Sequence, residues 1–190
     1  MEEDVAKACQ VLRQGGLILY PTDTVWGIGC DATRGEAVRR LYALKRRELG
    51  RPMLVLMDSP DRLGLYVEHV PDIAYDLLEA ADKPLTLILP GAKNLTPELI
   101  PENGSIGIRI TREPFSQALC HRFGKPIVST SANISDEPSP SIFEQISEVV
   151  RQGVDYIVRY RQDDLTQGHP SAIIELGEGG LFRIIRDPLP

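Results

Sequence analysis

The chain has 190 residues, of which 42% are apolar and 25% charged, and its net charge is −6 at neutral pH. These values are typical of one soluble globular domain, and they disfavour disordered chains and proteins that bind nucleic acid through a broad basic surface. No apolar run reaches the roughly 18 residues of a membrane span. The scattered cysteines and histidines indicate neither disulfides nor a metal site, so we expect a cytoplasmic protein.

Helix and strand patterns alternate along the whole chain without a linker-like break, which predicts a single domain over residues 1–190. Apolar residues at helical spacing, Cys9 among them, predict a first helix that ends at Gly15. The apolar run 16–20 ends at Pro21 and predicts a buried strand. Further helices are predicted over 36–47, 71–81, 114–123 and 141–152, and further strands over 53–57, 85–89, 106–110, 126–130, 155–160, 171–176 and 181–186. This order predicts an α/β domain with a mixed sheet and helices on both faces.

Polar side chains gather at the ends of several predicted strands, where open α/β sheets commonly bind ligands. PTDT (21–24) follows the first strand, STSAN (129–133) ends another, and HPSAI (169–173) and IIRD (184–187) add a serine and an arginine. Arg109 lies inside an apolar strand, where a cation costs free energy unless it is paired or faces a cavity. Ordinary structural explanations stay open: a β-turn for PTDT, a helix-capping turn for STSAN and a salt bridge for Arg109.

The segment RRLYALKRRELGR (39–51) carries six of the 21 basic residues of the chain and only one acid. A solvated helix face is the simplest explanation. Lys45, however, falls at the margin of the predicted apolar stripe, so its stem could lie on the core while its ammonium enters a cleft. Arg47 and Arg51 follow the last helical turn and are free to face the same cleft. The other cations of the segment are expected to be solvated, namely Arg39, Arg40 and Arg46.

No phosphate-binding glycine loop is present, so a bound nucleotide would have to be held by side chains and scattered amides. Six segments taken together resemble the YrdC-type family of threonylcarbamoyl-adenylate synthases: PTDTVWGIGCDA, KRRELGRPM, KPLTLIL, SIGIRI, PIVSTSANISDEPSP and HPSAIIEL. They follow the order and spacing of the family over about 17–186. The resemblance implies a three-layer α/β fold of the YrdC/RibB-like type, with a twisted mixed sheet and a deep cationic cavity, in the short single-domain form.

The resemblance also implies an activity, that of a nucleotidyltransferase. L-Threonine, bicarbonate and ATP would condense to threonylcarbamoyl-AMP and pyrophosphate, for the threonylcarbamoyladenosine modification of tRNA. The expected threonine contacts are Thr24, Arg109, Ser129 and Ser171. The expected ATP contacts are Lys45, Arg47, Arg51, Ser105, Ser131, Asn133, Ser139 and Arg186. We assign Lys45 and Arg47 the catalytic role of stabilising charge on the phosphates, and we expect Mg²⁺ to accompany ATP, with no protein-only metal site.

Expected partners are the downstream enzymes that transfer the threonylcarbamoyl group to tRNA, and direct contact with tRNA or double-stranded RNA stays open. Two alternatives are a double-stranded RNA-binding or ribosome-associated module of the same fold without catalysis, and a paralogue acting on another small molecule. The acidic charge outside 39–51 disfavours the first. The intact KxR motif (Lys45, Arg47) and SAN motif (131–133) disfavour the second.

Overall fold

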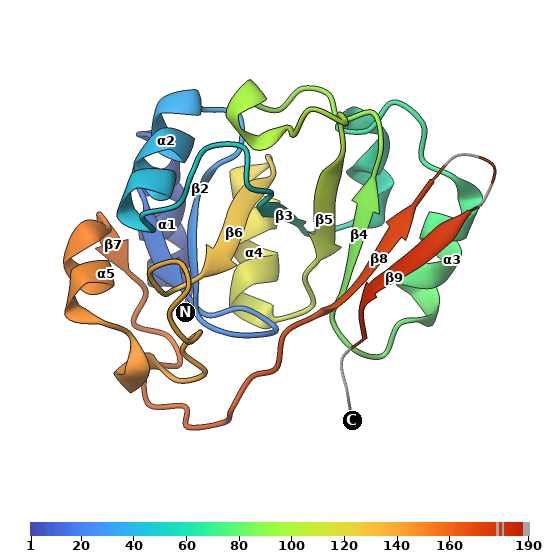
Figure 1. Ribbon diagram of the computed structural model, residues 1–190. Helices are drawn as coiled ribbons and strands as arrows, with labels where there is room; N and C mark the ends of the chain where they lie inside the picture. The colour runs from blue at the N-terminus through green and yellow to red at the C-terminus, as the bar shows by residue number, and fades with distance from the viewer. Residues whose placement is uncertain (178, 180, 188–190) are drawn as a thin grey trace.

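One twisted mixed sheet of nine strands runs through the computed structural model, which describes residues 1–177, 179 and 181–187 (Figure 1). The strand order is β7-β1-β2-β6-β3-β5-β4-β8-β9. The pairs β1/β7, β3/β5 and β4/β8 are parallel and the others are antiparallel. The strands are β1 (Ile18–Tyr20), β2 (Gly27–Asp31), β3 (Leu54–Met57), β4 (Leu85–Leu89), β5 (Ile106–Ile110), β6 (Ile127–Ser131), β7 (Tyr156–Ile157), β8 (Ala172–Leu176) and β9 (Phe182–Arg186).

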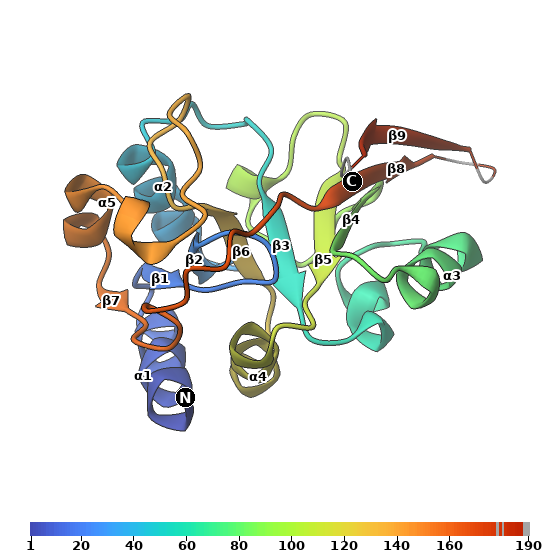
Figure 2. The same cartoon turned by 90° about the horizontal axis from the view of Figure 1, so that it is seen from below.

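Helices cover both faces of this sheet, as predicted, and Figure 2 shows α1 and α4 on the opposite side from α2. The α-helices are α1 (Glu2–Arg13), α2 (Gly35–Leu44), α3 (Asp72–Ala80), α4 (Pro114–Phe123) and α5 (Glu148–Gly153). Short 3₁₀ helices are η1 (Pro60–Leu65), η2 (Pro97–Leu99) and η3 (Phe143–Gln145). Among the described residues, every helix is too short or too polar to cross a lipid bilayer.

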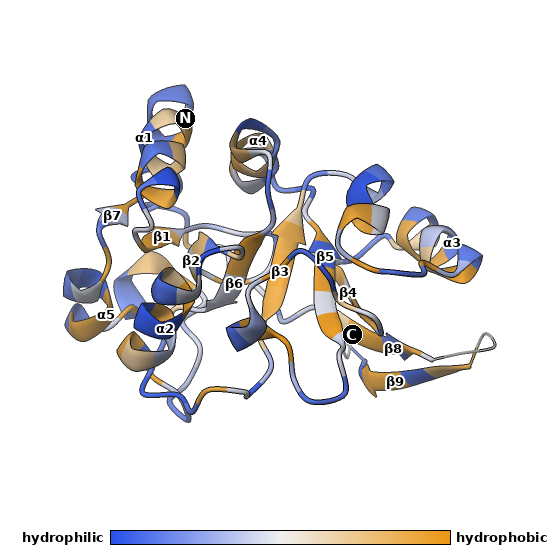
Figure 3. Cartoon of the chain, turned by 90° about the horizontal axis from the view of Figure 1, so that it is seen from above, coloured by the Kyte–Doolittle hydropathy of each residue, from blue (hydrophilic) through white to orange (hydrophobic). Residues whose placement is uncertain are grey.

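Side chains that alternate along the strands divide the core into two layers. One layer joins Val55, Ile108 and other strand residues to α2 and α3. The second joins Ile18, Leu56 and Ile127 to α1 and α4, with Cys9 buried in it as predicted. In Figure 3 the strands are largely apolar, whereas the helices carry both apolar and polar residues. The predicted α/β domain with a mixed sheet is therefore confirmed.

The predicted helix 36–47 is wrong at its C-terminal end, because α2 stops at Leu44 and Lys45 is its C-cap. Arg46 has a left-handed backbone, with φ of 51°. The Lys45 carbonyl accepts a hydrogen bond from the amide of Ser135, at 2.9 Å, and so lies outside the helical pattern. This tertiary contact therefore ends α2 at Leu44, so that the basic residues 45–47 lie outside the helix.

Three further differences have local causes. The predicted helix 141–152 is only η3 followed by α5, because the side chain of Ser147 accepts from the Val150 amide and begins α5 there. Of the predicted strand 155–160 only β7 forms; the Val158 amide still donates to the Leu19 carbonyl oxygen of β1, whereas the Tyr160 amide donates to the Asp4 carboxylate. Strand β2 was not predicted, because glycines at 27 and 29 weaken the strand pattern. A Cβ at Gly29 would lie 2.8 Å from both the Tyr20 ring and the Val128 carbonyl oxygen.

Candidate functional site

A cavity of about 320 Å³ opens on the sheet face that carries Leu54, Arg109 and Ser129, and we call it the polar cavity. Eight of the twelve predicted site residues line it: Thr24, Arg47, Arg109, Ser129, Ser131, Ser139, Ser171 and Arg186. They come from loops and strands far apart in the chain. Among the described residues that line this cavity, three are arginines and none is acidic. The sequence-based site is therefore largely brought together in space.

The turn between β1 and β2 places two threonine hydroxyls at the cavity. Thr22 donates from Oγ1 to the Val25 carbonyl oxygen at 2.7 Å, and it accepts from the Thr24 amide at 3.1 Å. The Oγ1 atoms of Thr22 and Thr24 lie 3.0 Å apart. A Cβ at Gly168 would overlap the carbonyl oxygen of Thr24, so the segment before β8 passes closely over this turn. The PTDT turn is thus fixed both by its own hydrogen bonds and by its contact with the segment before β8.

Arg109 contributes a buried guanidinium from the middle of β5, and its side chain is 5% exposed. Its Nε lies 3.1 Å from Oδ1 of Asp23, whose side chain is 11% exposed. Burial raises the pKa of Asp23, and the Arg109 charge partly offsets that rise. We did not predict Asp23 as a site residue. The available signals were its place in PTDT and the need of a buried arginine for an acidic partner.

Ser171 and Arg186 form one hydrogen-bonded unit in the wall of the polar cavity. Arg186 donates from Nε to the Ser171 carbonyl oxygen at 2.8 Å, and Ser171 Oγ lies 2.8 Å from Oγ1 of Thr86. Burial lowers the pKa of Arg186, and the positive charge of Arg109 lowers it further. Two guanidinium groups therefore repel each other across this cavity, and a bound anion would offset that repulsion.

Lys45 and Asn133 lie behind the cavity wall and do not line it. The Lys45 ammonium donates to the carbonyl oxygens of Ser131 and Asn133 at 2.6 and 2.7 Å. The side-chain Nδ2 of Asn133 donates to the carbonyl oxygens of Ile134 and Glu137. Burial, and secondly the charge of Arg47, lower the pKa of Lys45 to about 8. In this arrangement the side chains of Lys45 and Asn133 hold the STSAN turn through hydrogen bonds, and Ser131 lies where this turn lines the cavity.

Arg51 and Ser105 are not brought into the polar cavity. Arg51 is exposed, and its Nη1 lies 4.0 Å from Oδ1 of Asp136. Ser105 lines a neighbouring cavity of about 310 Å³, which we call the apolar cavity because most of its wall is aliphatic. Both cavities share Met53, Leu54 and Ile173 in their walls, so they adjoin each other.

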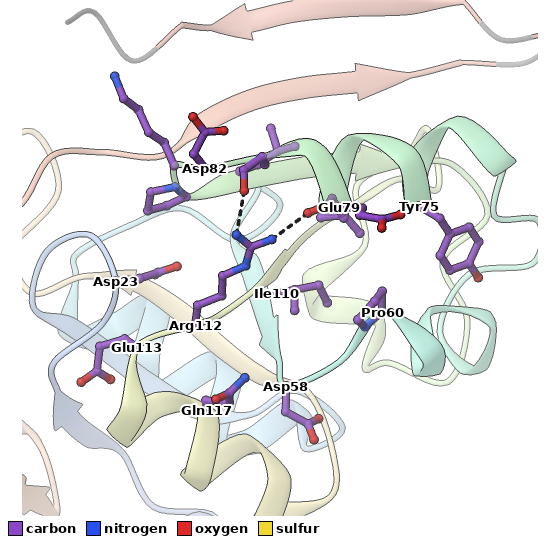
Figure 4. A pocket seen from close by; sticks show the side chains of 15 residues that line it. Asp23, Asp58, Pro60, Tyr75, Glu79, Asp82, Ile110, Arg112, Glu113 and Gln117 are labelled. Carbon is purple, nitrogen blue, oxygen red and sulfur yellow. Dashed lines mark hydrogen bonds between the residues drawn. The ribbon is translucent and has the colours of Figure 1, made fainter.

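A larger pocket of about 740 Å³ lies near α3 and the start of α4, and we call it the acidic pocket (Figure 4). Its wall contains five carboxylates and two cations, namely Asp23, Asp58, Glu79, Asp82, Glu113, Lys83 and Arg112. The Arg112 guanidinium donates to the carbonyl oxygens of Ala81 and Leu78 at the end of α3, at 2.7 and 2.9 Å. An acidic wall repels anions, so the polar cavity is the candidate site for carboxylates and phosphates.

Comparisons with known proteins agree with one another. Residues 10–187 match the family model Sua5_yciO_yrdC, described as "Telomere recombination". The threonylcarbamoyl-AMP synthase of Pseudoalteromonas translucida is 36% identical over 188 residues, which cover 96% of this chain and 98% of that protein. The protein of the same name from Pseudomonas aeruginosa is 34% identical, and the match covers 93% of this chain and 94% of that protein.

Solved structures with the same arrangement include Sua5 of P. abyssi. A double variant of that protein is 25% identical with a TM-score of 0.88, and the match covers 99% of this chain and 57% of that one. Sua5 of P. abyssi complexed with L-threonine is also 25% identical, with a TM-score of 0.81, over 93% of this chain and 52% of that one. The chain thus spans little more than half the length of Sua5. YciO of E. coli, 24% identical with a TM-score of 0.85, matches 100% of this chain and 91% of its own and shares the fold.

Proposed function

This chain belongs to the Sua5/YciO/YrdC family and is an enzyme, and we propose that it is a threonylcarbamoyl-AMP synthase that acts as a nucleotidyltransferase. The observation that carries the proposal is the polar cavity, where three arginines meet several hydroxyls without a lining carboxylate among the described residues. Its proposed substrates, L-threonine, bicarbonate and ATP, are anionic or carry a carboxylate. The names of relatives aligned over nearly their whole length support the same activity.

We assign the walls of the two adjoining cavities to different parts of the substrates. Arg109 would bind the threonine carboxylate, and hydroxyls of Thr24, Ser129 and Ser171 would contact the rest of the amino acid. Arg47 and Arg186 would bind the phosphates, together with Ser131 and Ser139. The apolar cavity beside Ser105 is suited to the adenine base, because aliphatic side chains surround it. Mg²⁺ is expected to enter with ATP and to be bound by phosphate oxygens, since the described residues that line the polar cavity include no carboxylate.

The proposed reaction brings together anions that repel one another in water. The threonine ammonium group first loses one proton, and the resulting amine reacts with bicarbonate to give a carbamate and water. A carbamate oxygen then bonds to the α-phosphorus of ATP as the bond to the β-phosphate breaks, and pyrophosphate leaves. Fixed guanidinium groups offset the repulsion between carbamate, carboxylate and triphosphate, and they stabilise charge that builds on the phosphate oxygens. The unstable adenylate would pass to enzymes that transfer the threonylcarbamoyl group to tRNA in the cytoplasm.

A pyrophosphate-release assay tests the proposal directly. We expect release from ATP only when both L-threonine and bicarbonate are present, and we expect the product to have the mass of threonylcarbamoyl-AMP. Release that does not depend on threonine would contradict the proposal. Salt-sensitive RNA binding without turnover would instead support the RNA-binding module, which the net charge of −6 disfavours.

A further inference from the structure

Among the ion pairs of the described residues, the pair formed by Asp23 and Arg109 is distinguished by having both side chains buried. The two side chains are 11% and 5% exposed, and Nε and Oδ1 are 3.1 Å apart. Within the described part of the chain, neither of these two atoms has an aligned hydrogen bond to any group. A buried carboxylate or guanidinium without its partner costs several kcal/mol, so each of these residues stabilises the charged form of the other.

The fold brings the pair together from distant elements. Asp23 lies in the β1–β2 turn, which Thr22 holds through its hydroxyl. Arg109 lies in the centre of the sheet, where β5 pairs it with Leu56 of β3 and Thr86 of β4. The backbones at both ends of the ion pair are therefore fixed, and a fixed partner restricts the rotamers of a long arginine side chain.

Asp23 contacts Arg109 from behind the cavity wall. Arg109 lines the polar cavity, whereas Asp23 lines the acidic pocket, where Figure 4 shows its carboxylate. A guanidinium has two edges that can bind carboxylates, one through Nε and one through the two Nη groups. Asp23 is closest to the Nε atom, and the Nη groups make no hydrogen bond or ion pair to another described residue.

We propose that Asp23 is a positioning residue: it holds the Arg109 guanidinium so that its Nη groups face the polar cavity and bind the carboxylate of the amino-acid substrate. This inference rests on the proposed function. Asp23 acts through Arg109 and does not touch the substrate. Loss of its carboxylate allows the arginine to adopt other rotamers, which weakens threonine binding and leaves ATP binding largely intact.

Steady-state kinetics with both substrates test this role. For Asp23→Ala we expect the KM for L-threonine to rise at least tenfold, while the KM for ATP changes less than twofold. Asp23→Asn keeps the shape of the side chain and is expected to show a smaller rise in the same direction. Asp82→Asn is the matched control, because Asp82 lines the same acidic pocket and is not paired with Arg109; its kinetics should equal those of the wild type.

A double-mutant cycle separates positioning from a general structural role. If Asp23 acts only through Arg109, Asp23→Ala has no further effect on the threonine KM once Arg109→Ala is present. Additive effects, or equal rises in both KM values, would overturn the proposal. Calorimetric titration of the wild type with L-threonine distinguishes failure of the proposed function from failure of this inference. A wild type that neither binds nor turns over threonine refutes the proposed function together with this inference, whereas an active wild type with unchanged Asp23 variants refutes this inference alone.

Discussion

Lys45 carries an ammonium that is almost completely buried, and this should make the stability of the protein depend on pH. The residue is 1% exposed, and its Nζ donates to two backbone carbonyl oxygens of the STSAN turn. Burial lowers its pKa to about 8 from the ordinary value of 10.5, with a smaller contribution from the charge of Arg47. Folding therefore weakens the affinity of this amine for its proton.

The sign of the effect follows from proton binding in the two states. Between pH 8 and 10.5 the unfolded chain holds a proton on Lys45 that the folded protein has lost. The contribution of Lys45 to the free energy of unfolding therefore rises with pH through this range, and falls again as the pH is lowered towards 8. Each pH unit contributes roughly 1.4 kcal/mol, so raising the pH from 7 to 9.5 should add about 2 kcal/mol.

Denaturant unfolding of the wild type and of Lys45→Met at both pH values measures this contribution. The other titratable groups are common to the two proteins, so the difference between their unfolding free energies isolates Lys45. We expect that difference to shift by about 2 kcal/mol in favour of the wild type at the higher pH. Lys7→Met is the control, because Lys7 is half-exposed and should show no such shift. A difference that stays constant within about 0.5 kcal/mol would refute the reasoning.

Two further substitutions test the sheet and the cavity. Gly29→Ala should lower the free energy of unfolding by about 1–3 kcal/mol, because its Cβ would lie 2.8 Å from the Val128 carbonyl oxygen. Gly64→Ala is the control, because a Cβ at Gly64 would have no atom within 4 Å. Equal thermal midpoints for the two variants would contradict the prediction that Gly29 is required by packing. Arg47→Ala should reduce pyrophosphate release about 100-fold or more if Arg47 stabilises developing charge. Arg39→Ala should change the rate little, since Arg39 is half-exposed and paired with Glu98; equal losses in both variants would remove the special role of Arg47.

The elements that could be predicted from the sequence are those whose burial follows one clear period. Strand β5 follows the alternating sequence pattern of Ile106, Ile108 and Ile110, and α4 begins at Pro114 and ends at Phe123, before Gly124, as expected. Strand β2 could not be predicted in this way, because Gly29 is required by close packing against β1 and β6, and no local pattern reveals those neighbours. Tertiary contacts likewise decide where α2 ends.

The site was predictable to the extent that strand ends deliver polar residues to one place. Ser131 and Ser171 lie at such ends and do meet in the polar cavity, where Ser129 of β6 joins them. Asp23 escaped prediction because its role depends on Arg109, which is 86 positions away and reaches it across the sheet. The assignment of each residue to threonine or ATP came from the family resemblance and stays a prediction.

The basic segment 39–51 explains how an acidic protein can offer a cationic cavity. Arg39 and Arg40 project from the outer face of α2 and are paired with Glu98 and Asp155, so their charges are balanced at the surface. The left-handed backbone at residue 46 redirects the chain beyond the helix, and Arg47 then lines the polar cavity. Among the described residues no carboxylate lies within 4 Å of its guanidinium. The position of each cation relative to the end of α2 therefore decides whether it stabilises the fold or stays available to an anion. The total charge of the segment does not decide this.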